Sequence, residues 1–123
     1  MTLRRRGTPS HESLYLDAYA HAVKEMASSG TPMDGGCIEA SVLMHKYLRE
    51  HGKRAELVRR DLGSDEGHWT IRTSDGEFDP TINFWNGGRG GLRIVRKSDP
   101  HRQWPETTAD ERGAYSTVFG RHG

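Results

Sequence analysis

Cys37, His68 and Asp79 have the residue types, in the order along the chain, that covalent catalysis on an acyl group needs. In such chemistry a cysteine thiolate attacks the carbonyl carbon, a histidine moves the proton, and a carboxylate orients the imidazole. Cys37 follows Gly35-Gly36, a pair that lets the backbone turn sharply and approach a ligand closely. The pattern predicts a cysteine nucleophile, against the alternative that Cys37 is a small buried core residue.

The segment that starts at Cys37 has the apolar spacing of an amphipathic helix and reaches about His51, where Gly52 provides the usual stop. We therefore expect Cys37 in the first turn of this helix, with Asp34 as the N-cap residue. A helix N-terminus stabilises negative charge, which favours a thiolate. Its free N–H groups can also bind an oxyanion, and the Cys37 N–H is the first candidate for this role.

Beyond this helix the residue pattern changes to that of β-strands. Three strands are predicted, over residues 54–60, 68–73 and 77–79, with a hairpin turn at Asp75-Gly76. A turn of two or four residues would place Asp79 on the same sheet face as His68, whereas a turn of three would place it on the opposite face. We expect the first arrangement, in which Asp79 bonds one ring nitrogen of His68 and leaves the other for Cys37.

The remaining elements complete an α+β fold in which two N-terminal helices pack on a small antiparallel sheet of three to five strands. A first helix is predicted over roughly residues 11–28, capped by Ser10, and a further strand over 92–95. Thr107 or Thr108 is expected to cap a short last helix whose inward side chains are Tyr115, Val118 and Phe119. We interpret residues 1–123 as a single domain, with residues 1–9 as a flexible tail.

Three short motifs in this order resemble the transglutaminase-like branch of the papain-fold superfamily of cysteine proteases. They are Gly35-Gly36-Cys37-Ile38-Glu39-Ala40-Ser41, Gly67-His68-Trp69-Thr70-Ile71 and Asp75-Gly76-Glu77-Phe78-Asp79-Pro80-Thr81. In that branch a cysteine opens a helix, a histidine begins a later strand, and an aspartate ends the next strand, often in an Asp-Pro-Thr sequence. The resemblance implies that Cys37 is the nucleophile, His68 the general base and acid, and Asp79 the orienting carboxylate. It covers less than half of the chain and implies a papain/transglutaminase-like core.

The function that this resemblance implies is amide hydrolysis through a thioester, on a peptide or a glutamine side chain, by a protease or deamidase. Two alternatives remain open: a transglutaminase-like amine acyltransferase, and a catalytically inactive protein that binds a peptide in the same fold. The expected partner is a peptide or protein substrate. Substrate-binding candidates are Gly36, Trp69, Asn83 and Trp85, with core packing as the competing role for Trp69.

Composition gives no support to several other classes of protein. The 18 basic and 17 acidic residues leave a net charge of +1, so neither nucleic-acid nor membrane binding is predicted. The glycine-rich segment at 87–91 lacks a phosphate-binding pattern, and no histidine or cysteine stands at zinc-site spacing from His68. We therefore expect no cofactor and no metal. A single cysteine and no long apolar run predict a soluble, cytoplasmic protein.

Overall fold

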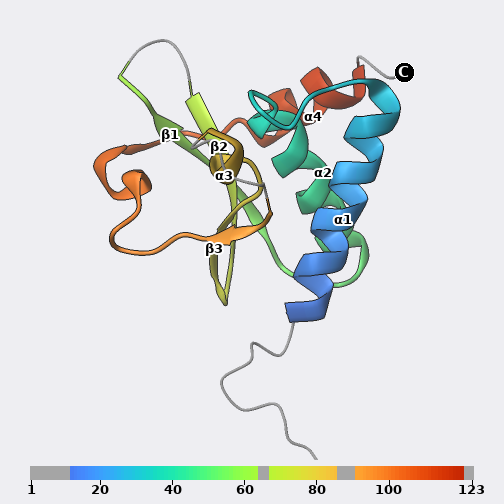
Figure 1. Ribbon diagram of the computed structural model, residues 1–123, viewed down its shortest axis with the longest axis horizontal. Helices are drawn as coiled ribbons and strands as arrows, with labels where there is room; N and C mark the ends of the chain where they lie inside the picture. The colour runs from blue at the N-terminus through green and yellow to red at the C-terminus, as the bar shows by residue number, and fades with distance from the viewer. Residues whose placement is uncertain (1–11, 64–66, 86–90, 121–123) are drawn as a thin grey trace, which may run out of the picture.

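The computed structural model describes residues 12–63, 67–85 and 91–120 and has the α+β architecture expected from the sequence (Figure 1). The elements follow the order α1 (Glu12–Ser29), α2 (Cys37–Glu50), β1 (Glu56–Asp61), β2 (Gly67–Thr73), β3 (Gly76–Asp79), α3 (Ile82–Trp85), β4 (Arg93–Ile94), η1 (Pro100–Gln103), β5 (Glu106–Thr107) and α4 (Glu111–Gly120). The expected N-cap Ser10 and the tail over residues 1–9 lie outside the described residues.

The strands form one antiparallel sheet in the order β4-β3-β2-β1-β5, so β2 lies at its centre. Thr73 pairs with Gly76, which leaves Ser74 and Asp75 as a two-residue turn between β2 and β3. Gly76 has φ 133°, a backbone conformation that favours glycine. This even turn length puts Asp79 on the same face of the sheet as His68, as the sequence predicted.

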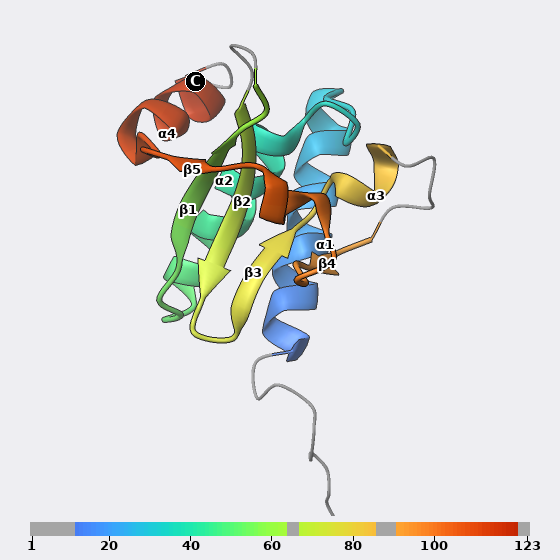
Figure 2. The same ribbon diagram turned by 90° about the vertical axis from the view of Figure 1, so that its left-hand side faces the viewer.

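Helices α1 and α2 cover one face of this sheet, and the chain between β4 and α4 crosses the other face (Figures 1 and 2). We call residues 95–107, which include η1 and β5, the strap. Trp69, Ile71 and Phe78 point to the helices and belong to the hydrophobic core. The alternate residues of β2 and β3 point to the strap, and these are polar. Their buried polar groups can be tolerated only if they find partners, and the strap provides several of them.

A buried ion pair attaches the strap to the sheet. The guanidinium of Arg60 lies 2.7 Å from a carboxylate oxygen of Glu77, and both side chains are at least nine-tenths buried. Arg60 Nη1 also donates to the backbone oxygens of His101, at 3.1 Å, and Trp104, at 2.9 Å. The two bonds from Nη1 connect the strap to the sheet, while Glu77 balances the buried charge of Arg60.

Some local expectations were wrong in detail. The N-cap of α2 is Gly36, which makes no side-chain capping bond, and not Asp34. Helix α4 is capped by Asp110, whose Oδ1 accepts the Gly113 N–H at 2.9 Å, whereas Thr107 belongs to β5. An aspartate accepts such a bond as well as a threonine does, so several candidate residues near a helix start compete for the role. The strand expected over 92–95 forms only as Arg93–Ile94.

The inward packing of the last helix is confirmed. Val118 is fully buried, and Tyr115 and Phe119 pack against the core. The Tyr115 hydroxyl also hydrogen-bonds to His45 Nδ1 at 2.6 Å, which connects α4 to α2. None of the described helices combines the length and apolar character needed to cross a lipid bilayer.

Candidate active site

Cys37, His68 and Asp79 come together at one end of the sheet. Cys37 is the first residue of α2, and its Sγ lies 3.9 Å from the carbonyl oxygen of Gly67 at the start of β2. His68 follows on β2, while Asp79 is the last residue of β3. Since the register places Asp79 level with Thr70, His68 extends beyond the end of β3, and there it meets the N-terminus of α2. Three elements therefore position the three side chains predicted from the sequence.

The imidazole of His68 and the carboxylate of Asp79 form a short hydrogen bond, 2.5 Å from Nε2 to Oδ2, with both side chains fully buried. The other oxygen, Oδ1, accepts the backbone N–H groups of Thr81 at 2.9 Å and Ile82 at 3.0 Å. Pro80 ends β3, and the turn after it directs these N–H groups back at the carboxylate. The Asp-Pro-Thr sequence thus holds Asp79 in a fixed orientation toward His68.

Opposing effects set the charge of this pair. Burial lowers the pKa of His68, but the hydrogen bond to Asp79 and an interaction with Cys37 outweigh it and raise the pKa to about 9. Burial alone would raise the pKa of Asp79, yet hydrogen bonds from His101 and His68 bring this pKa well below its usual range. At neutral pH the site therefore holds an imidazolium beside an ionised carboxylate. A cation next to a thiol favours the thiolate.

His101 belongs to the same cluster and was not expected there. Its Nε2 lies 2.6 Å from Asp79 Oδ2, the oxygen that also bonds His68, and the side chain is fully buried. The sequence around it has no periodicity, and Pro100 at the start of η1 indicates only a turn. No signal in the residues near His101 points to chemistry.

Trp104 from the strap covers the two imidazoles. Its ring centroid lies 5.5 Å from that of His68 in an edge contact and 5.3 Å from that of His101. Cys37 is half-buried, whereas His68, Asp79 and His101 are fully buried. Within this cluster, Cys37 is thus the residue that is partly accessible, and the imidazoles and the carboxylate are shielded from water.

The cluster also has the donor types of a metal site. The ligand atoms of His68, Asp79 and His101 lie within 4.8 Å of one another. Zinc ligands are bonded at about 2 Å, so neighbouring donors in a tetrahedral site stand roughly 3 Å or more apart. The separations of 2.5 and 2.6 Å between nitrogen and oxygen are those of short hydrogen bonds. As the side chains stand, both Nε2 atoms are hydrogen-bonded to Asp79 Oδ2.

The predicted substrate-binding residues are more dispersed. Gly36 is the N-cap of α2 and adjoins Cys37. Trp69 is 9% exposed and packs in the core on the helix face, while Asn83 Nδ2 donates to the backbone oxygen of Gly91 at 3.3 Å. The side chain of Trp85 lies outside the described part of the chain. Of these four residues, Gly36 is the one placed directly beside the sulfur.

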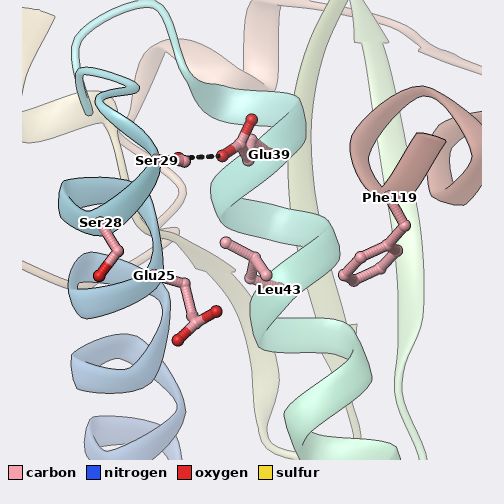
Figure 3. Close-up of a pocket in the computed structure, with 6 residues that line it drawn as sticks. All are labelled: Glu25, Ser28, Ser29, Glu39, Leu43 and Phe119. Atoms are coloured by element: carbon pink, nitrogen blue, oxygen red, sulfur yellow. Dashed lines mark hydrogen bonds between the residues drawn. The ribbon is translucent and has the colours of Figure 1, made fainter. Parts of the chain in front are cut away.

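Two surface hollows lie near this end of α2. One, of about 320 Å³, is lined by Ile38, Arg59, Trp69, Thr108, Asp110, Gly113, Ala114 and Thr117, and none of the cluster residues lines it. The other, of about 250 Å³, lies between α1, α2 and α4 (Figure 3). It contains the hydrogen bond from Ser29 Oγ to Glu39 at 3.3 Å and none of the cluster residues.

No family model, no curated protein and no solved structure matches this chain. The α+β fold is established by the structure, and the papain/transglutaminase-like core stays a prediction. What the site can do must therefore follow from its own geometry.

The raised pKa of His68 predicts a loss of stability in alkaline solution. An unperturbed histidine has a pKa of ~6.5, so the folded chain, with a value of about 9, binds this proton more tightly than the unfolded chain. The contribution is complete below pH 6.5 and is lost as the pH rises to about 9, at most about 3 kcal/mol. Urea unfolding across this range should show the decline in the parent but not in His68→Gln. An equal decline of the unfolding free energy in both proteins would contradict the attribution of this pH dependence to His68.

Proposed function

We propose that this protein is a cysteine-dependent amide hydrolase that acts on a peptide bond or a glutamine side chain. The observation that carries this proposal is the buried hydrogen bond between His68 and Asp79, placed at the N-terminus of the helix that presents Cys37. A thiol beside an imidazolium that is held by a carboxylate is the arrangement that nucleophilic catalysis by cysteine requires. The raised pKa of His68 adds support, because it favours the charged pair.

In the proposed first half-reaction, the Cys37 thiolate attacks the substrate carbonyl carbon and an Sγ–C bond forms, while the carbonyl electrons move to oxygen. The first-turn N–H groups of α2 face no capping side chain and would stabilise this oxyanion. His68 then gives its Nδ1 proton to the leaving nitrogen, the C–N bond breaks, and an amine or ammonia departs. A thioester on Cys37 and a neutral His68 remain.

In the second half-reaction His68 takes a proton from water, which attacks the thioester carbon. Collapse of the tetrahedral adduct breaks the Sγ–C bond, releases a carboxylic acid, and restores the thiolate and the imidazolium. Asp79 keeps Nε2 engaged throughout, so that Nδ1 is always the nitrogen that faces the sulfur. If an amine replaces water in this step, the same residues would catalyse acyl transfer.

An activated ester tests thioester formation without knowledge of the natural substrate. With 4-nitrophenyl acetate we expect a burst of nitrophenolate equal to one acetyl group per chain, located on Cys37 by mass spectrometry of peptides. The burst should vanish in Cys37→Ala, and its rate should fall in His68→Gln because the thiolate is no longer favoured. Glutamine peptides in ¹⁸O-labelled water would follow, with a new labelled carboxylate as the expected product. A product amide with added amine would instead indicate acyl transfer.

Absence of Cys37 acetylation, or acetylation at the rate of the urea-unfolded chain, would contradict the hydrolase and favour a peptide-binding protein. The unfolded chain is the matched reference, because it has the same cysteine without the cluster.

A further inference from the structure

One carboxylate oxygen of Asp79 serves two histidines. Oδ2 lies 2.5 Å from His68 Nε2 and 2.6 Å from His101 Nε2, and the two ring centroids are 5.6 Å apart. All three side chains are fully buried, so water does not compete for these bonds. A catalytic triad needs only one histidine hydrogen-bonded to its carboxylate. The proposed mechanism therefore does not explain why His101 also bonds to Asp79.

The protons on these atoms can be assigned from geometry. An ionised carboxylate oxygen only accepts, so both Nε2 atoms must carry the hydrogen. The Nδ1 of His101 is buried and has no hydrogen-bond partner among the described residues. A hydrogen there would have no acceptor, which favours the tautomer with the lone pair on Nδ1. His101 Nε2 is thus a fixed donor to Asp79 Oδ2.

The fold holds His101 in place through the strap. Arg60 Nη1 donates to the His101 backbone oxygen, and the same guanidinium is anchored by Glu77. Arg60 pairs with His68 across β1 and β2, so one cation fixes the turn that carries His101 relative to the strand that carries His68. Thr70 Oγ1, which donates to Glu77 at 2.6 Å, completes the support. The arrangement brings together residues from three separate parts of the chain.

We propose that His101 is a positioning residue of this site, which shares Asp79 with His68 and so limits how strongly the carboxylate holds the imidazolium. The inference rests on the proposed function of Cys37, His68 and Asp79. A carboxylate oxygen that accepts two hydrogen bonds is a weaker acceptor for each of them. Without the second donor, Asp79 would stabilise the His68 imidazolium more strongly, and the Nδ1 proton would be harder to transfer to the leaving nitrogen.

Burial lowers the pKa of His68, and four neighbours surround the ring: Asp79, Cys37, the Arg60–Glu77 ion pair and His101. Asp79 from β3 and Cys37 from α2 favour the imidazolium. Arg60 from β1 pairs with His68 across the two strands, and its charge is balanced by Glu77. His101 from η1 acts on His68 through Asp79. Replacing His101 therefore changes one contact to the carboxylate and leaves the other three groups in place.

Two variants of His101 separate the effect of its hydrogen bond to Asp79 from the effect of its aromatic ring. Glutamine can place its Nε2 amide hydrogen where the histidine Nε2 hydrogen lies, so His101→Gln should keep the bond to Asp79. Phenylalanine keeps an aromatic ring against Trp104 but cannot donate, so His101→Phe should lose it. The His68 ring is followed by NMR in ¹⁵N-labelled parent and variants from pH 5 to 11, together with the pH dependence of Cys37 alkylation.

We expect His101→Phe to raise the pKa of His68 by about one unit, with His101→Gln close to the parent. The step in the alkylation profile that reports His68 deprotonation should move by the same amount. An unchanged or lowered pKa in His101→Phe, or an equal shift in both variants, would overturn the inference. So would tight binding of Zn²⁺ to the parent that is lost in His101→Gln, because these atoms would then be metal ligands.

Failure of the proposed function would look different. If Cys37 in the parent reacts no faster than in the unfolded chain, the nucleophile is not activated, whatever His68 does in the His101 variants. If the parent is activated but His101→Phe leaves the His68 titration unchanged, the proposed function stands and the role of His101 does not.

Discussion

Replacing His68 with glutamine is expected to slow the alkylation of Cys37 by iodoacetamide at pH 6 by about two orders of magnitude. The glutamine amide can still donate to Asp79, but it carries no charge and has no nitrogen that accepts a proton. A thiol without a cationic partner titrates near ~8.5, so less than about 1% of it would be thiolate at pH 6. In the parent, the imidazolium beside Cys37 should maintain fast alkylation from pH 6 up to about 9, where His68 loses its proton.

The matched control is His45→Gln. His45 is as fully buried as His68, and its ring nitrogens hydrogen-bond to the Tyr115 hydroxyl and the Ala55 backbone oxygen. Its replacement should cost stability but leave the rate of Cys37 alkylation within about twofold of the parent, because it is not among the groups that act on His68. Equal losses of rate in the two variants would mean that alkylation reports general loosening of the fold, and the activated thiol would have to be abandoned.

Cys37, His68 and Asp79 could be predicted because their positions follow from local sequence patterns of helices and hairpins. The helix that begins at Cys37 follows from apolar spacing and Gly52, and the facing of His68 and Asp79 follows from a two-residue turn in a hairpin with period-two alternation. A one-residue change in that turn would have separated the two side chains. The order of the three residues was therefore informative because each stands at the boundary of a regular element.

His101 could not be predicted, because its place depends on contacts between distant parts of the chain. It lies 22 residues after Asp79, in a strap with two short elements and no apolar period. The strap is held by Arg60, whose paired Glu77 also stands on the polar face of the sheet. In the sequence, Arg60 and Glu77 look like the solvent-facing charges of two strands. Their burial becomes evident only when the strap is seen to cover that face (Figure 2).

Asp79→Asn should abolish the raised pKa of His68 and bring it below the ordinary ~6.5. Burial, the first influence on His68, lowers its pKa, and the hydrogen bond that His68 donates to Asp79 is the largest opposing contribution. An asparagine has one accepting oxygen, which cannot satisfy both the backbone N–H groups on Oδ1 and the two imidazole N–H groups on Oδ2. At least one of these two sets of hydrogen bonds must therefore rearrange. If His68 accepts from the new amide, its hydrogen moves to Nδ1, the nitrogen that should serve Cys37.

The unfolding free energy should fall by about 3–5 kcal/mol in Asp79→Asn, because a buried charge network loses its central member. Asp75→Asn is the control, since Asp75 accepts a hydrogen bond from Tyr15 at the other end of the β2–β3 hairpin and should cost only about 1 kcal/mol. NMR titration of His68 and urea unfolding at pH 7 measure the two effects. A His68 pKa still near 9 in Asp79→Asn would show that Cys37 alone sustains the imidazolium, and the orienting role of Asp79 would then be wrong. If the pKa of His68 falls but the free energy of unfolding does not, the buried cluster would set the His68 pKa without contributing to the stability of the fold.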